Sequence, residues 1–359
     1  MTNFLSFVDE EINILEEANE QFMLFHPFYA REGKLNWKTI HELQQIETFI
    51  FADNNIVSPI CEIVKNGTLV NKDRLRKVAA FVTLTKYLNA PMTCGLALIE
   101  NDTAGKASIS AEENRQLFLY GVDNIPPNIW KQLALGQIDA IPYAFLKGYH
   151  YEPSEKKYSF SDELHYLCHK AAITKIVTLL RSGANDGFQK FFDFFNWYID
   201  HLILSESIIA YAALVFGGQK GVAKPKKFAS PNFDKAIEGI DNQAWDMFYL
   251  SQWSTFYYYE EAHQVFMFAS DDKTTKEILK HSLPPGKVQE TISEIFHTVS
   301  QRKLIKQLYT DKLGDNRKRP FAQDETEKGI EIVKRLISKE MDNLQKTFLP
   351  VVRKRITHI

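Results

Sequence analysis

Residues 47–53 read ETFIFAD, and this short stretch decides the fold class. Its centre is a run of β-branched and aromatic residues, which pack well on the pleated surface of a sheet. The run ends abruptly at Asp53, and the polar residues Asn54 and Asn55 follow it. The pattern predicts a buried strand that ends in a polar loop.

A second stretch, residues 263–272, has the same design. It reads HQVFMFASDD, an apolar strand pattern that ends at Ser270, Asp271 and Asp272. A third apolar run, residues 92–99, leads into Glu100. In open α/β sheets the carboxyl ends of the strands meet at the crevice where ligands bind. We therefore expect the acids that follow these runs to lie close together.

Most of the remaining chain has the spacing of helices. Residues 5–25 place apolar side chains three and four positions apart, which predicts an amphipathic helix. Further helices are predicted over residues 72–88 and 241–256. The segment 103–231 is mostly helical in pattern, and its last part, GGQKGVAKPKKFASP at 217–231, has the composition of a positively charged loop. The sequence thus predicts an α/β protein with a central, mostly parallel sheet and an extra helical layer.

The bulk composition is typical of a folded intracellular protein. The chain has 359 residues, of which 45% are hydrophobic, and its formal net charge of −2 does not indicate a nucleic-acid or membrane partner for the chain as a whole. The N-terminus carries acids where a secretion signal has basic residues, and no apolar run approaches the ~20 residues of a spanning helix. Cys61, Cys94 and Cys168 lack CxxC spacing, which argues against a zinc ribbon or disulfide framework. We therefore expect a cytoplasmic protein with buried thiols and no membrane contact.

Four carboxylates are candidate metal ligands: Asp53, Glu100, Asp246 and Asp272. Asp246 has large aromatic neighbours on its predicted helix, and a carboxylate in such surroundings is costly to bury unless a cation or a donor satisfies it. Acids brought together repel one another, and a bound divalent cation relieves the repulsion. Mg²⁺ or Mn²⁺ prefers such oxygen ligands and can activate a water for attack on a phosphodiester.

These patterns resemble the PIN-domain nucleases, a family that includes the ribonuclease toxins of bacterial toxin–antitoxin pairs. FADNN at 51–55 resembles the first strand and turn of the family, which makes Asp53 the first acid and Asn55 its supporting residue. AWDMFYLSQW at 244–253 is similar to the helix that bears the third acid, here Asp246.

The late strand of the family resembles VFMFASDDKTTKEIL at 265–279. Ser270 and Asp272 then occupy its Thr/Ser-x-Asp positions, and Asp271 is the variable residue between them, with Ser270 and Asp271 in supporting roles. Glu100 corresponds to the second acid by its order in the chain. Glu206, which opens an apolar helix, competes with Glu100 for that role.

The resemblance also implies a domain organisation. Residues 47–102 and 232–285 would form the two halves of a three-layer, PIN-like nuclease core, with residues 103–231 as a helical insertion. Residues 1–46 would be an N-terminal helical segment and residues 286–359 a basic C-terminal helical segment. The implied function is a Mg²⁺- or Mn²⁺-dependent endoribonuclease of toxin, stress-response or phage-defence type. RNA is the implied substrate, and a regulatory protein or antitoxin and an oligomer are compatible with it.

Two groups of basic residues are candidate RNA-binding sites: Lys224, Lys226 and Lys227, and Arg317, Lys318 and Arg319. Basic patches attract phosphate backbones by releasing counterions, although they also occur as ordinary solvated surface. The aromatic run at 191–198 could stack bases but is interpreted as core or interface, and the pair His165 and His169 could bind a metal but is interpreted as structural or surface. Two other functions remain open: a non-enzymatic binding or scaffold protein, and a DNase or other phosphoesterase that uses the same acids.

Overall fold

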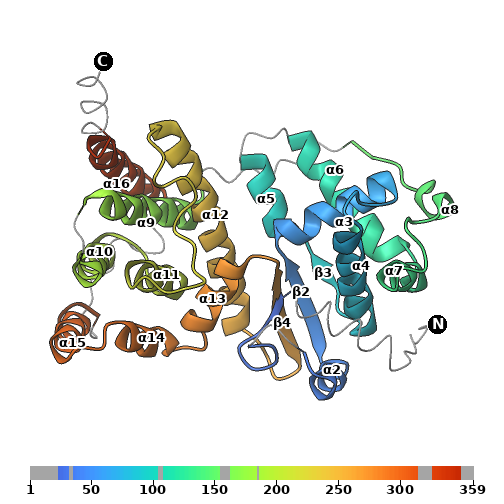
Figure 1. The fold of residues 1–359 in the computed structure, drawn as a ribbon, viewed down its shortest axis with the longest axis horizontal. Coiled ribbons are helices and arrows are strands. Elements are labelled where there is room, and N and C mark those ends of the chain that lie inside the picture. Colours follow the sequence, from blue (N-terminus) through green and yellow to red (C-terminus); the bar gives the residue numbers. More distant parts are fainter. Residues whose placement is uncertain are drawn as a thin grey trace. The chain divides into compact units, whose positions relative to one another are not determined.

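The computed structural model describes residues 23–31, 35–103, 108–153, 162–183, 186–313 and 326–348. These residues form a mixed α/β protein whose helices and strands divide into two compact units (Figure 1). The sheet unit comprises Met1–Ser159 and Gln252–Asp272, and the helical unit comprises Phe160–Ser251 and Lys273–Ile359. The break after Ser159 falls inside the segment 103–231, so that segment contributes to both units.

The sheet unit contains four strands in the described part of the chain. Its elements are β1 (Met23–Phe25), α2 (Trp37–Leu43), β2 (Glu47–Ala52), α3 (Asn54–Asn66), α4 (Lys72–Tyr87), β3 (Met92–Thr93), α5 (Gly95–Thr103), α6 (Ser108–Leu119), the π-helix η1 (Tyr120–Asn124), α7 (Pro127–Ala134), α8 (Tyr143–Leu146) and β4 (Gln264–Ser270). The order across the sheet is β1-β4-β2-β3. β2 is parallel to both β3 and β4, and β1 is antiparallel to β4. The predicted mixed α/β class with a mostly parallel sheet is therefore confirmed.

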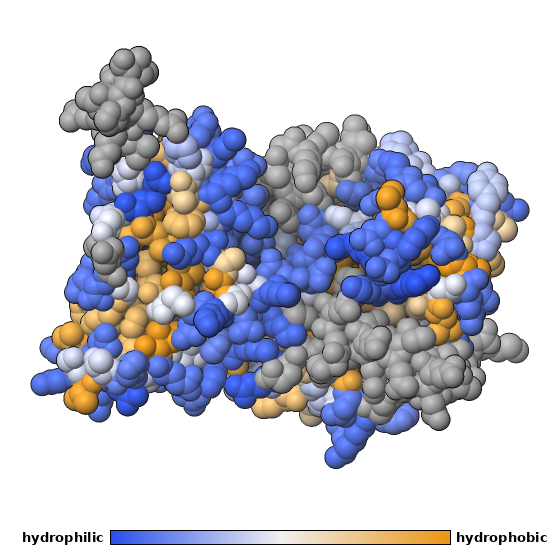
Figure 2. All heavy atoms as spheres, viewed as in Figure 1, coloured by the Kyte–Doolittle hydropathy of each residue, from blue (hydrophilic) through white to orange (hydrophobic). Residues whose placement is uncertain are grey.

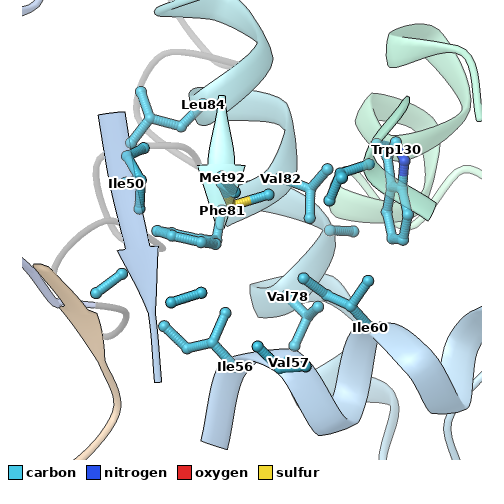
Figure 3. Close-up of a cluster of buried hydrophobic side chains, with 14 of the residues drawn as sticks. Ile50, Ile56, Val57, Ile60, Val78, Phe81, Val82, Leu84, Met92 and Trp130 are labelled. Atoms are coloured by element: carbon cyan, nitrogen blue, oxygen red, sulfur yellow. The ribbon is translucent and has the colours of Figure 1, made fainter. Parts of the chain in front are cut away.

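β2 alternates between two faces, as its sequence pattern requires. Ile50 faces the core formed with α3 and α4, whose labelled members in Figure 3 include Ile56, Val57 and Phe81. Each large apolar side chain buried in this way contributes about 1.5–3 kcal/mol relative to exposure. This core holds β2 rigidly, and with it the residue that follows the strand.

The opposite face of the sheet carries aromatic residues. Phe49 stacks on Phe266 of β4 with ring centroids 5.5 Å apart. Trp253 lies edge-on to Phe25 of β1, and its indole N–H donates to the Phe266 carbonyl at 3.0 Å. Trp253 belongs to the last turns of α12 (Phe233–Tyr258), which therefore cover part of this face. Within the sheet unit, β4 therefore has contacts with both β2 and α12 on this face.

The structure corrects two expectations about local structure. The predicted helix over 5–25 is wrong at its end, because Met23–Phe25 form the edge strand β1; the preceding residues lie outside the described ones. The apolar run at 92–99 splits into the two-residue strand β3 and the helix α5, so Glu100 lies on a helix and not at the end of a strand. A short apolar run can pack as a buried helix as well as a strand, and its periodicity does not separate the two.

The helical unit contains α9 (Leu164–Arg181), α10 (Gly187–His201), α11 (Glu206–Phe216), the part of α12 up to Ser251, α13 (Lys273–Ser282), α14 (Lys287–Ile295), α15 (Val299–Leu313) and α16 (Thr326–Lys346). α9 packs along α16 (Figure 1), and the ion pair of Lys175 with the buried Glu340 joins the two helices at 3.4 Å. None of the helices in the described ranges combines the length and the apolar character needed to cross a bilayer.

The aromatic run at 191–198 belongs to the core of the helical unit. Phe191, Phe194, Phe195 and Tyr198 of α10 are all buried, and Phe194 stacks on Tyr198 with ring centroids 5.4 Å apart. Hydrophilic side chains dominate the face seen in Figure 2, and hydrophobic ones gather over the region of α10 and α11. The buried rings pack against one another, which agrees with a structural interpretation.

Candidate active site

Asp53 lies at the carboxyl end of β2 and is the N-cap of α3. Its backbone N–H extends the sheet by donating to the Ala269 carbonyl at 2.9 Å. Its carboxylate oxygen Oδ1 accepts the backbone N–H of Asn54 at 2.6 Å, which satisfies one of the unpaired donors at the helix start. The side chain is buried, with 9% of the residue exposed.

The second carboxylate oxygen of Asp53 accepts two side-chain hydrogen bonds. The Asn55 amide Nδ2 donates to Oδ2 at 2.7 Å, and the Ser270 hydroxyl donates to the same atom at 2.7 Å. Asn55 comes from the first turn of α3 and Ser270 from the last position of β4. The carboxylate is therefore fixed by one donor from the helix that follows β2 and one donor from the end of the neighbouring parallel strand β4.

Ser270 and Asn55 also hold the chain that follows β4. The Ser270 hydroxyl oxygen accepts the backbone N–H of Asp272 at 3.0 Å and the Asn55 amide at 3.0 Å. The Asn55 amide oxygen accepts the backbone N–H of Asp271 at 2.9 Å. These bonds bring together Asp53, Asn55, Ser270, Asp271 and Asp272, and we call this group the acidic site. Hydrogen bonds between these residues fix the positions of the Asp271 and Asp272 backbone.

A positively charged side chain that was not identified from the sequence, that of Arg74, lies at the acidic site. Arg74, in the first turn of α4, donates from Nη2 to the Asn55 carbonyl at 2.9 Å. Its Nη1 lies 3.4 Å from Oδ2 of Asp271, and both side chains of that ion pair are partly exposed. Asn71, the N-cap of α4, accepts the backbone N–H of Arg74 at 3.0 Å and fixes the start of the helix. The sequence signal was the basic segment KDRLRK, but nothing in it indicated proximity to Asn55.

The other two predicted acids are placed differently. Glu100 lies on α5 of the sheet unit, and its side chain is outside what the structure describes. Asp246 lies on the part of α12 that belongs to the helical unit, where it accepts a hydrogen bond from the Gln243 amide at 3.3 Å. The competing residue Glu206 is the first residue of α11, also in the helical unit.

One of the two basic groups can be described. Lys224, Lys226 and Lys227 are exposed on the loop between α11 and α12, and Lys227 pairs with Glu238. Gly239 of α12 lets this loop pass close to the helix, because a Cβ at that position would lie 1.7 Å from the Lys226 carbonyl oxygen. Arg317, Lys318 and Arg319 lie outside the described residues.

His165 and His169 differ in environment although they share α9. His165 is exposed, whereas His169 is buried and bonds to the His165 carbonyl through Nδ1 and to the Ser251 hydroxyl through Nε2, each at 2.7 Å. Since a carbonyl only accepts, Nδ1 carries the proton and Nε2 accepts from Ser251. Burial lowers the pKa of His169 to about 4. The residue joins α9 to α12 within the helical unit.

The three cysteines are buried free thiols, as the sequence predicts. Burial raises the pKa values of Cys61, Cys94 and Cys168 to about 12.

Across the described ranges, no three side chains of His, Cys, Asp or Glu are arranged to hold a metal ion. Comparison of the chain with models of protein families gives no match, and searches of curated proteins and of solved structures give none either.

Proposed function

We propose that this protein is a divalent-metal-dependent endoribonuclease with a PIN-like core in its sheet unit, active in the cytoplasm. The observation that carries the proposal is the fixed position of Asp53 at the carboxyl end of β2, held by Asn55 and by Ser270. Ligand sites of open α/β sheets lie at this edge. Asn55 and Ser270 were assigned supporting roles from the sequence, and each donates a hydrogen bond to the Asp53 carboxylate.

The position between β2 and β4 favours a binding site. From β2 the chain runs through α3 and α4 to β3 on one side, whereas β4 lies on the other side of β2. Neighbouring strands whose connections lead to opposite sides leave room for a ligand beyond their carboxyl ends. Asp53 follows β2 and Ser270 ends β4, the two strands that flank this point.

The donor set of the acidic site suits a hard cation. Asp53 and Asp272 offer carboxylate oxygens, the ligand type that Mg²⁺ and Mn²⁺ prefer. When bound, such a cation supplies an activated water and neutralises charge that develops on the phosphate. Asp53 and Asp272 would hold it, with Glu100 as a further ligand proposed from the sequence; Asp246 belongs to the helical unit and stays a prediction from the sequence alone.

The supporting residues would act by restricting motion. The hydroxyl of Ser270 and the amide of Asn55 prevent rotation of the Asp53 carboxylate, because both donate to the same oxygen. A ligand oriented in this way loses little freedom when it binds a cation, and hydrogen-bond partners of metal ligands commonly affect metal affinity 10–100-fold. RNA as the substrate, and a regulatory protein or antitoxin as a partner, rest on the family resemblance alone.

A panel of substrates tests the proposal. The purified chain would be incubated with total RNA, single-stranded DNA, duplex DNA and p-nitrophenyl phosphate, each with EDTA, Mg²⁺, Mn²⁺ or Ca²⁺. We expect cleavage of RNA with Mg²⁺ or Mn²⁺, little with Ca²⁺ because of its looser coordination, and none in EDTA. Cleavage confined to DNA or to the small phosphate would assign another phosphoesterase activity, and no cleavage together with no Mn²⁺-dependent shift in melting temperature would favour a non-enzymatic protein.

A further inference from the structure

Arg74 has the contacts of a residue placed to receive a phosphate group. Its guanidinium is anchored at one end, because Nη2 donates to the main-chain carbonyl of Asn55 at 2.9 Å. The side chain of the same Asn55 donates to the Asp53 carboxylate. The cation is therefore connected to the proposed metal ligand through a single residue, and its position does not depend on a flexible loop.

The other end of Arg74 is held weakly. Nη1 lies 3.4 Å from the Asp271 carboxylate, which is long for a charge-assisted hydrogen bond. The side chains of Arg74 and Asp271 are 40% and 37% exposed. Ion pairs this accessible to water contribute little, typically below about 1 kcal/mol. An incoming anion can therefore displace Asp271 at small cost.

The charge of the acidic site favours such a contact for a polyanionic substrate. Asp53, Asp271 and Asp272 repel a phosphodiester, and a cation fixed among them reduces that repulsion. Arginine suits this role because its planar fork can bind two oxygens of one phosphate. A guanidinium has five N–H donors, and the contacts described here engage one on each of the two terminal nitrogens.

We propose that Arg74 binds a backbone phosphate of single-stranded RNA beside Asp53, and that Asp271 is its partner until the substrate displaces it. This inference rests on the proposed nuclease function and extends it to the residue that positions the substrate. It also assigns to Asp271, the variable position of the family pattern, a role as a competitor of the substrate and not as a metal ligand.

A binding measurement separates this role from catalysis. The anisotropy of a 5′-labelled single-stranded RNA would be followed in EDTA at several KCl concentrations for wild type, Arg74→Gln and Arg74→Lys. We expect Arg74→Gln to weaken binding about tenfold and to reduce the salt slope by ~0.7, the value of one phosphate contact on a single strand. Arg74→Lys should be intermediate, because it keeps the charge and loses the fork.

Two further variants complete the test. Arg76→Gln is the matched control, since Arg76 is an exposed arginine two positions along α4, and it should leave binding unchanged. Asp271→Asn should tighten RNA binding a few-fold, because it removes the competing carboxylate, and it covers the case in which Arg74→Gln fails to fold.

The outcomes distinguish this inference from the nuclease proposal. If wild type cleaves RNA but Arg74→Gln and Arg76→Gln bind it equally well, Arg74 has no role in binding and the nuclease proposal stands. If wild type binds RNA through Arg74 and cleaves nothing, the nuclease proposal fails and the binding site stands. If wild type neither binds nor cleaves RNA, both are wrong.

Discussion

The hydroxyl of Ser270 donates to the carboxylate of Asp53 at 2.7 Å across a sequence separation of 217 residues. Asp53 follows β2 and Ser270 is the last residue of β4; these parallel strands pair directly, with Ala52 opposite Ala269. The sheet register therefore brings the two side chains together, and their hydrogen bond depends on the pairing of β2 with β4. Stability and activity should consequently be linked at this position.

Ser270→Ala should lower both the stability of the protein and its rate of RNA cleavage. The substitution leaves Oδ2 of Asp53 without one donor and the backbone N–H of Asp272 without its acceptor, at a cost of about 1–3 kcal/mol in the free energy of unfolding. RNA cleavage should fall by tenfold or more because the carboxylate is less restrained. Urea unfolding and initial rates measure the two effects. Ser282→Ala removes another buried hydroxyl, from α13 of the helical unit, and should leave cleavage intact. Equal rates for Ser270→Ala and wild type would show that the hydroxyl only supports the fold.

The second acid can be assigned by a pair of substitutions. Glu100→Gln should lower turnover by orders of magnitude and raise the Mn²⁺ concentration required, if Glu100 is a metal ligand on α5. Glu206→Gln removes a first-turn acid of α11 and should cost only ~0.3–1 kcal/mol in stability. Steady-state rates at increasing Mn²⁺ concentration, with thermal unfolding of both variants, make the comparison. A large loss of turnover in Glu206→Gln and none in Glu100→Gln would reverse the assignment.

Acid should destabilise the protein through His169. Burial lowers the pKa of His169 from 6.5 to about 4, so the unfolded chain binds more protons than the folded one between these values. The contribution of neutral His169 to the free energy of unfolding is complete above pH 6.5. As the pH falls toward 4 this contribution is lost, by up to about 3 kcal/mol. His169→Gln should remove this slope from the free energy of unfolding, measured by urea titration at several pH values. His165→Gln, which changes the exposed histidine of the same helix, should keep the slope. The same pH dependence in wild type and His169→Gln would contradict the assignment.

The three thiols should be unreactive in the folded protein. Burial raises the pKa values of Cys61, Cys94 and Cys168 to about 12, and only the thiolate reacts with disulfide reagents. We expect negligible reaction with Ellman's reagent at pH 8 and release of three equivalents of chromophore after unfolding in guanidinium. Rapid reaction of one thiol in the native protein would show that the region around that cysteine opens readily.

The sequence was sufficient to predict the strands that carry the acidic site. ETFIFAD and QVFMFAS are runs of β-forming residues that end sharply in polar residues, and both are strands in the structure. The supporting roles of Asn55 and Ser270 stay predictions from the resemblance of these strand ends to a known family. A local pattern was enough here because strand and site residues are adjacent in the chain.

Other features depend on contacts that a linear pattern does not encode. The contact of Arg74 with Asp271 spans 197 positions and arises from the packing of α4 against the sheet. β1 is three residues long, too short for its alternation to be distinguished from a helix end. The division of the chain into two units also requires tertiary contacts, because Ser251 and Gln252 are consecutive residues of one helix and belong to different units.

The most direct test is the initial rate of RNA cleavage with Mn²⁺ for wild type, Asp53→Asn and Asp186→Asn. Asp186 caps α10 with its carboxylate as Asp53 caps α3, so its substitution controls for the loss of a capping acid. We predict that Asp53→Asn abolishes Mn²⁺-dependent cleavage while the protein remains folded, and that Asp186→Asn cleaves at the wild-type rate. Cleavage by Asp53→Asn at the wild-type rate would show that Asp53 only caps a helix, and it would contradict the proposal that this carboxylate is a metal ligand of a nuclease.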